Sequence, residues 1–158
     1  MFKITLSPNV HRPPRVLVAD DDSIIRLLVT SILKMEGCMP VVVEDGREAY
    51  RVLQSDADFK AAIFDMNMPH LEGLEIIRYM RTERRLMRIP VMLITSGCDL
   101  KLMSESFAAG AAVFLPKPFT TGQLQLMLRM LLEKGERADP PLRRAKDNYE
   151  RLTACGTN

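Results

Sequence analysis

Side chains able to hold a cation or a phosphoryl group stand directly after short apolar runs of this sequence. Acids follow "RVLVA" and "AAIF", a hydroxyl pair follows "PVMLI", and a lysine lies in "LPKPF" after "AVFL". These residues are Asp20, Asp21, Asp22, Asp65, Thr95, Ser96 and Lys117. Like charges placed side by side repel one another, so the acids predict a nearby counter-charge. A divalent cation together with the lysine would supply it.

The charges balance if such a cation binds. Asp20, Asp21 and Asp65 are offset by a divalent ion and Lys117. Carboxylate oxygens, with positions left open for water and phosphate, favour Mg²⁺. With a phosphoryl group on one carboxylate, the cation and the lysine would hold the added charge, and the hydroxyl of Thr95 would donate to it. Taken singly, an acidic pair could cap a helix and the lysine could be solvated.

The apolar runs themselves predict the framework. Residues 15–19, 40–43, 61–64, 90–94 and 112–115 are aliphatic without polar alternation, as expected of strands buried on both faces. Helical spacing separates them, over 24–35, 46–54, 71–83, 100–109 and 120–134. In the first of these helices the apolar set is Ile24, Ile25, Leu28, Ile32 and Met35. Alternating strands and helices predict a doubly wound α/β domain, whose ligands bind outside the carboxyl ends of parallel strands.

Local signals refine the ends of these helices. Asp22, with Ser23, is expected to cap the first helix, so we assign only two of the three neighbouring acids to the cation. Thr120 and Gln123 stand in capping-box register, and Gly37 and Gly110 follow the first and fourth helices as stop signals.

Composition limits the class of protein. The chain has 158 residues, 47% of them hydrophobic, which suits one globular domain. A net charge of +2 without a basic stripe argues against direct nucleic-acid binding. No apolar run is long enough for a membrane span or a secretory signal, so we expect a cytoplasmic protein without membrane contact. Cys38, Cys98 and Cys155 lack metal-ligand spacing and are expected to be reduced thiols.

Together these motifs resemble the receiver domains of two-component response regulators, over residues 14–134. The resemblance rests on "DD", "D-x-N-M-P-x-x-x-G", "T-S" and "K-P-F" occurring in order after strands one, three, four and five. It implies a flavodoxin-like five-stranded sheet of order 2-1-3-4-5 with helices on both faces, and a phosphorylation-dependent switch rather than an ordinary enzyme. The donor would be a histidine kinase or histidine phosphotransfer protein.

The resemblance also implies residue roles. Asp65 would accept the phosphoryl group, and Lys117 would pair first with Asp65 and then with the phosphate. The Mg²⁺ ligands would be Asp20, Asp21, Asp65 and the backbone carbonyl of Asn67. Asn67 and Gly97 occupy the positions that tend to set the lifetime of the acyl phosphate, and their mixture predicts no particular lifetime.

The switch residues carry one departure from the family pattern. Thr95 would follow the phosphoryl group together with the aromatic Phe114. That position is often tyrosine, so Phe114 can change rotamer but has no hydroxyl to donate. The resemblance further implies a cis peptide bond between Lys117 and Pro118.

Output is expected to pass through protein contacts. Residues 1–13 would form a leader without chemistry, and 135–158 are too short for an effector domain. The tail is either a surface helix, able to dock through Leu142, Tyr149 and Leu152, or disordered. In the last helix Leu124, Met127, Leu128 and Leu131 are expected to face the sheet. Leu126 and Met130 lie off that face and could serve a downstream protein or a homodimer through the fourth helix, fifth strand and fifth helix.

Three other classes fit less well. A haloacid-dehalogenase-like phosphatase would carry its nucleophile after the first strand, with a second aspartate where this chain has Asn67. A receiver-like module that is never phosphorylated would have no use for a crowded acidic pocket. A flavodoxin-like FMN protein shares the topology, but the acids after its first strand would repel the phosphate.

Overall fold

The computed structural model describes residues 12–97 and 99–137, with side chains through residue 135. Five strands alternate with five helices, as the sequence predicts. In chain order they are β1 Arg15–Ala19, α1 Ser23–Met35, β2 Met39–Val43, α2 Gly46–Ser55, β3 Ala61–Asp65, α3 Gly73–Thr82, β4 Val91–Thr95, α4 Leu100–Ala109, β5 Val113–Pro116 and α5 Thr121–Arg137. The last helix continues past its predicted end at Lys134.

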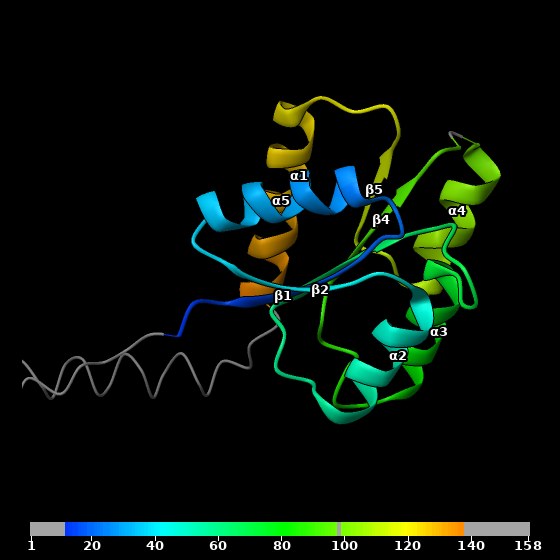
Figure 1. Cartoon of the computed structure of the whole chain (residues 1–158). Helices are drawn as coiled ribbons and strands as arrows, with labels where there is room; N and C mark the ends of the chain where they lie inside the picture. The colour runs from blue at the N-terminus through cyan, green and yellow to red at the C-terminus, as the bar shows by residue number, and fades with distance from the viewer. Residues whose placement is uncertain (1–11, 98, 138–158) are drawn as a thin grey trace, which may run out of the picture.

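All five strands are parallel and lie in the order β2-β1-β3-β4-β5, which confirms the predicted topology. Helices α1 and α5 cover one face of the sheet, and α2, α3 and α4 cover the other (Figure 1). Each face has its own apolar layer, so the central strands contribute side chains to two cores. The carboxyl ends of β1, β3, β4 and β5 therefore meet along one edge of a rigid sheet.

The edge strand β2 differs from the prediction of strands buried on both faces. Val42 is 41% exposed, whereas every residue of β3 and β4 is buried. The backbone N–H of Met39 donates to the carbonyl of Pro14, so alternate residues pair with β1 and Pro40 faces the open edge. Because proline has no N–H, it weakens this edge as a template for further strands.

Helix α1 also departs from its predicted pattern. Val29, Ile32 and Leu33 are buried, whereas Ile24 and Met35 are 74% and 77% exposed. The predicted apolar set therefore included residues of the exposed face as well as residues that meet the sheet. Leu27, which is also exposed, adds a further apolar side chain outside the buried set. Apolar spacing did not identify the buried face of α1, because this helix carries apolar residues on its exposed side as well as on the side that meets the sheet.

The predicted helix signals are confirmed. The carboxylate of Asp22 accepts hydrogen bonds from the backbone N–H groups of Ile24 and Ile25. Thr120 and Gln123 form a reciprocal capping box, with bonds of 2.9 and 3.1 Å. Gly37 and Gly110 have positive φ after their helices, and the Lys117–Pro118 bond is cis.

In α5, Leu124, Leu128 and Leu131 are buried, Met127 is half-buried against the same layer, and Leu126 and Met130 are exposed, as predicted. Cys38 is a buried free thiol. No helix among residues 12–97 and 99–137 is long and apolar enough to span a bilayer. The domain limits at 14 and 134 remain predictions. Cys98, Cys155, the leader before residue 12 and the tail side chains Leu142, Tyr149 and Leu152 lie outside the described residues.

Two glycines allow the β3–α3 loop to pack closely. A Cβ at Gly46, the first residue of α2, would collide with the carbonyl of Leu71. A Cβ at Gly73, the first residue of α3, would collide with the carbonyl of Asp65. The backbone N–H of Gly73 also donates to the carbonyl of Met66 at 3.1 Å. The residue that ends β3 is thus held directly against the start of α3.

We expect Gly73→Ala to lower the free energy of unfolding by about 2 kcal/mol, because the added methyl group meets backbone that cannot move aside. Gly122→Ala is the matched control, since a Cβ there meets only Thr120 Oγ1 at 3.9 Å. Urea denaturation measures both. Equal stability of the two variants would contradict the close contact.

Candidate acidic site at the carboxyl edge of the sheet

The residues singled out in the sequence converge on one edge of the sheet. Asp20 directly follows β1, Asp65 and Thr95 are the last residues of β3 and β4, and Lys117 directly follows β5. One carboxylate oxygen from each of Asp20, Asp21 and Asp65 lies within 4.8 Å of the others. Asp21 is exposed, so the cluster opens to solvent on one side.

Asp20 is the most constrained of the acids. It is 2% exposed, and its Oδ1 accepts from the backbone N–H of Asp22 at 2.8 Å. Its Oδ2 is buried without a hydrogen-bond partner. Burial, aided by repulsion from Asp65, raises the pKa of Asp20 to about 6 despite the opposing bond from Asp22. A buried, unpartnered carboxylate oxygen is costly unless a cation meets it.

Asp65 is buried beside it, at 4% exposure. Burial raises the pKa of Asp65, although Lys117 and the backbone N–H of Asn67, which lies 3.3 Å from its Oδ1, act in the opposite direction. The neighbouring Asp21 raises this pKa further. The contacts of Asp65 with Lys117 and Asn67 therefore do not fully offset the cost of burying its negative charge.

Lys117 is the cation that the protein itself supplies. Its Nζ lies 3.6 Å from Asp65 Oδ2 and 3.9 Å from Asp20 Oδ2, as ion pairs rather than short hydrogen bonds. Its backbone N–H donates to the carbonyl of Thr95 at 2.6 Å, which ties the loop after β5 to the end of β4. One ammonium group shared between two carboxylates leaves net negative charge in the cluster.

Thr95 and Phe114 lie on neighbouring strands, β4 and β5. Thr95 is fully buried, and its Oγ1 accepts from the backbone N–H of Gly97 at 3.2 Å. Phe114 is half-buried, and its ring centroid lies 6.5 Å from that of Phe107 on α4. The two positions predicted to switch thus lie on adjacent strands, and Phe114 lies beside α4.

These donors fit a hard divalent cation. Three carboxylates gather around an opening, one of them presents an unpartnered buried oxygen, and a single lysine offsets part of their charge. The predicted ligands Asp20, Asp21 and Asp65 are therefore brought together. The participation of the Asn67 carbonyl stays a prediction. The side-chain amide of Asn67 donates to Ser96 Oγ at 3.4 Å, which spans the loops after β3 and β4.

Sequence reasoning missed Arg26 on α1. Its Nη1 donates to the backbone carbonyl of Asp20 at 2.7 Å, and its Nη2 lies 3.5 Å from Glu44. The guanidinium thereby fastens the acidic loop to the end of β2. A basic residue in the second turn of a helix that begins at an acidic run was the available signal.

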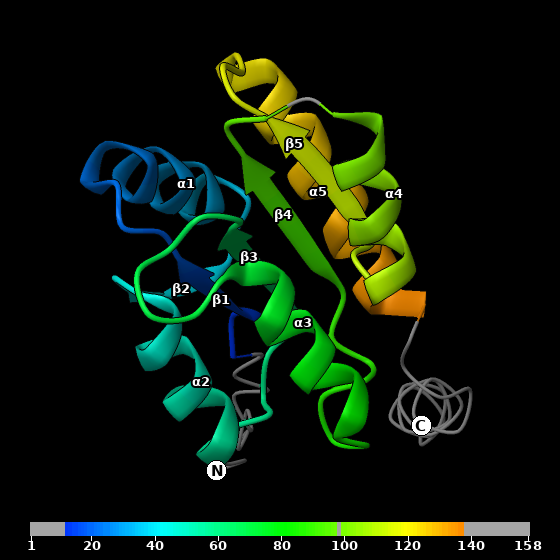
Figure 2. The same cartoon turned by 90° about the vertical axis from the view of Figure 1, so that its right-hand side faces the viewer.

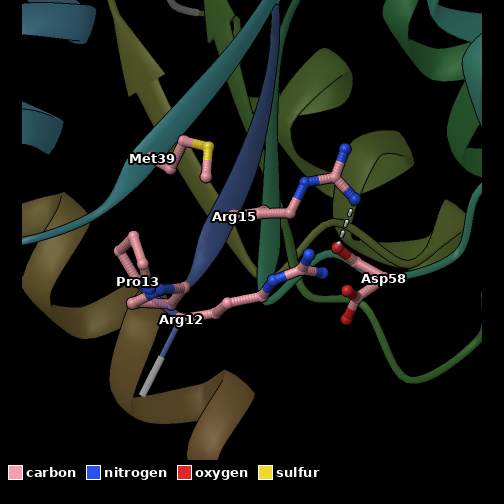
Figure 3. Close-up of a pocket in the computed structure, with 6 residues that line it drawn as sticks. Arg12, Pro13, Arg15, Met39 and Asp58 are labelled. Atoms are coloured by element: carbon pink, nitrogen blue, oxygen red, sulfur yellow. Dashed lines mark hydrogen bonds between the residues drawn. The ribbon is translucent and has the colours of Figure 1, made fainter. Parts of the chain in front are cut away.

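A separate hollow of about 360 Å³ lies at the opposite, amino-terminal end of β1 (Figure 3). Arg15 is engaged there: its Nη1 pairs with Asp56 at 2.8 Å and donates to the carbonyl of Asp58 at 3.2 Å. Its guanidinium also lies over the ring of Phe59. This cluster fastens β1 to the segment before β3 and is distant from the acidic site.

A family model for the response regulator receiver domain matches residues 16–129, which include all five converging residues. The chain belongs to the receiver family of two-component signalling. A receiver of this kind is a signalling switch rather than an enzyme of ordinary turnover.

Individual relatives agree with this assignment. The receiver is 33% identical over 119 residues to chemotaxis protein CheY1 of Helicobacter pylori, covering 75% of this chain and 96% of that protein. It is 34% identical over 122 residues to response regulator MprA of Mycolicibacterium vanbaalenii, covering 77% of this chain. It spans only 52% of the length of MprA, about half.

Solved structures share the fold. Chemotaxis response regulator CheY4 of Vibrio cholerae superposes with a TM-score of 0.70 at 31% identity, covering 76% of this chain and 99% of that one. The receiver domain of sensor histidine kinase PA1611 from Pseudomonas aeruginosa, described with a magnesium ion coordinated in its active-site cleft, has a TM-score of 0.68. At 23% identity, with 77% of this chain and 98% of that chain covered, it supports the fold alone.

The pKa of Asp20 gives a pH prediction for the metal-free protein. An unfolded aspartate releases its proton near pH 3.8, whereas folded Asp20 keeps it until about pH 6. Between these values the unfolded state binds fewer protons, so stability falls as pH rises, by about 2 to 3 kcal/mol from this group.

Urea denaturation in the presence of EDTA, at several pH values between about 4 and 6, tests this pH dependence by comparing the wild type with Asp20→Asn. We expect the difference in unfolding free energy between variant and wild type to grow with pH in favour of the variant. A difference that stays constant would show that burial of this carboxylate carries no such cost.

Proposed function

We propose that this receiver accepts a phosphoryl group on Asp65 from a histidine kinase or histidine phosphotransfer protein, with Mg²⁺, and signals through protein contacts. The observation that carries the proposal is the approach of Lys117 Nζ to Asp65 Oδ2, at 3.6 Å, inside a cluster of three carboxylates. Such a pair places a nucleophilic oxygen beside a cation that can stay with the transferred group.

In the proposed transfer, an Asp65 carboxylate oxygen forms a bond to phosphorus while the bond between phosphorus and the donor imidazole nitrogen breaks. The electrons of the broken bond stay on the imidazole nitrogen, and the ring leaves neutral because its other nitrogen carries a proton. Mg²⁺, held by Asp20, Asp21, Asp65 and the carbonyl of Asn67, would offset the charge of the phosphoryl oxygens. Lys117 exchanges part of its pairing with Asp65 for the new phosphate.

The proposed switch uses Thr95 and Phe114. The Thr95 hydroxyl accepts from Gly97, so its own proton is available to donate to a phosphoryl oxygen. Movement of Thr95 toward the phosphate would leave space that the half-buried Phe114 ring can enter. Phe107 packs beside that ring, so the same movement would reach α4. Because Phe114 has no hydroxyl, its proposed movement would change only the packing of the ring and form no new hydrogen bond.

A protein donor suits the surroundings of the site better than a small molecule does. Ile24 and Leu27, in the first turns of the helix that follows the acids, are 74% and 69% exposed. Exposed apolar side chains beside a polar pocket are typical of a protein contact. We assign them to the face that receives the donor.

A different face is proposed for output. Leu126 and Met130 on α5 are 55% and 42% exposed, and Leu100 and Phe107 on α4 are 78% and 47% exposed. These residues flank β5, which carries Phe114. A downstream protein or a second receiver bound here would sense the proposed movement of that ring.

Incubation with acetyl phosphate and Mg²⁺, followed by intact-mass measurement, tests the function. We expect the wild type to gain one phosphoryl group and Asp65→Asn to gain none. Asp22→Asn is the matched control, because Asp22 caps α1 and asparagine caps equally well. This variant should be phosphorylated like the wild type.

The proposal fails if the wild type gains no Mg²⁺-dependent mass, or if Asp65→Asn gains the same mass. Loss of phosphorylation in Asp22→Asn with its fold intact would also contradict it, because it would make all three neighbouring acids part of the site.

A further inference from the structure

A hollow of about 230 Å³ opens on the far side of the sheet from α1, between the first turns of α2 and the β3–α3 loop. Its walls are Arg47, Tyr50, His70 and Leu71. Figure 2 shows the loop passing beside the start of α2, and the collision of a Gly46 Cβ with Leu71 places the two backbones in contact. His70 holds a positive φ of 71°, so a non-glycine residue occupies an unfavourable backbone region here.

Two arginines lie beside this hollow without an anionic partner among the described residues. Arg47 and Arg51 are both exposed and lie one turn apart on α2. Within the described part of the chain neither makes an ion pair or a side-chain hydrogen bond. Two guanidinium groups are therefore free to pair with an incoming carboxylate or phosphate.

The nearby acids are already occupied by backbone groups. Asp45 Oδ1 accepts from the N–H of Glu48 at 2.8 Å, and Glu48 Oε2 accepts from the N–H of Glu44 at 2.9 Å. Glu75 Oε2 accepts from the N–H of Glu72 at 2.9 Å. These carboxylates serve the starts of α2 and α3, and within residues 12–97 and 99–137 none of them forms an ion pair with Arg47 or Arg51.

The aromatic residues favour a peptide over nucleic acid. Tyr50 and Tyr79 pack ring against ring with centroids 4.5 Å apart, and Arg85 donates to the Tyr79 hydroxyl at 3.4 Å. Tyr50 is thus engaged with Tyr79 within the protein, and one half-buried ring at this hollow is a small platform for stacking successive bases. What remains is an apolar recess with guanidinium groups at its rim, a shape suited to a side chain flanked by carboxylates.

Segments of this chain outside the described residues do not have the complementary charge. Residues 1–11 contain Lys3 and no acid, and residues 138–158 contain four lysines or arginines against three acids. Neither segment therefore offers the excess of carboxylates that would complement the two arginines.

We infer that the α2 face, defined as Arg47, Tyr50, Arg51, His70 and Leu71, docks an acidic peptide segment of a partner protein. An apolar side chain of that segment enters the hollow, and its neighbouring carboxylates pair with Arg47 and Arg51. This surface is separate from the phosphoacceptor pocket, so binding is expected to persist in Asp65→Asn.

The test is a selection of random dodecapeptides displayed on phage against the wild-type protein, followed by fluorescence anisotropy of the consensus peptide. We expect the consensus to place Asp or Glu beside Leu, Phe or Trp. Arg47→Glu should weaken binding about tenfold or more, because it replaces an attractive charge contact with a repulsive one.

Lys34→Glu is the matched control. Lys34 is exposed on α1, on the opposite face of the sheet, and its reversal changes the net charge by the same amount. It should leave the affinity within about twofold, because a distant exposed charge is screened. His70→Asn removes the ring from the hollow yet tolerates the positive φ, and should weaken binding while the melting temperature is retained.

The inference is overturned if no acidic consensus emerges, or if Lys34→Glu weakens binding as much as Arg47→Glu does. It is also overturned if single-stranded DNA competes with the peptide at equal charge concentration, since that outcome assigns the surface to polyanions in general. Replacing the apolar residue of the peptide by serine should lower the affinity. An unchanged affinity would contradict the inference that this side chain enters the hollow.

Discussion

The repulsion among Asp20, Asp21 and Asp65 is the constraint on which the functional edge of this receiver depends. Two of these carboxylates are buried, and among the described residues one has an oxygen without a hydrogen-bond partner and only Lys117 forms an ion pair with them. Burial disfavours their charged forms, so the fold keeps them at a cost in stability. Such a cost is typical of sites that are completed by a ligand, which we propose to be a cation and then a phosphoryl group.

The rest of the structure supports that cluster. The buried strands β3 and β4 fix the positions of Asp65 and Thr95, and the backbone bond from Lys117 to Thr95 joins β5 to them. Gly73 permits α3 to start directly against the backbone of Asp65, so a change at Asp65 acts directly on a packed helix. Packed interfaces of this kind respond to small shifts by changing between discrete arrangements, which suits a switch.

Strand order, the caps at Asp22 and Thr120, and the convergence of the four strand ends could be predicted because each follows from local pattern or from the parallel topology. The faces of α1 could not, because Ile24, Leu27 and Met35 are as apolar as the buried residues, and only packing separates the two sets. The edge exposure of β2 depends likewise on its neighbours. Arg26 and the α2 face depend on side-chain contacts between distant segments, which spacing does not encode.

Calorimetric melting of the wild type and Asp20→Asn during titration with Mg²⁺ tests the central claim most directly. A cation that binds the folded cluster and not the unfolded chain raises the melting temperature with concentration. The account predicts a clear rise for the wild type and a much smaller one for Asp20→Asn, which starts from a higher metal-free value. Equal responses of the two proteins, or no response of the wild type, would contradict a cation-dependent acidic site.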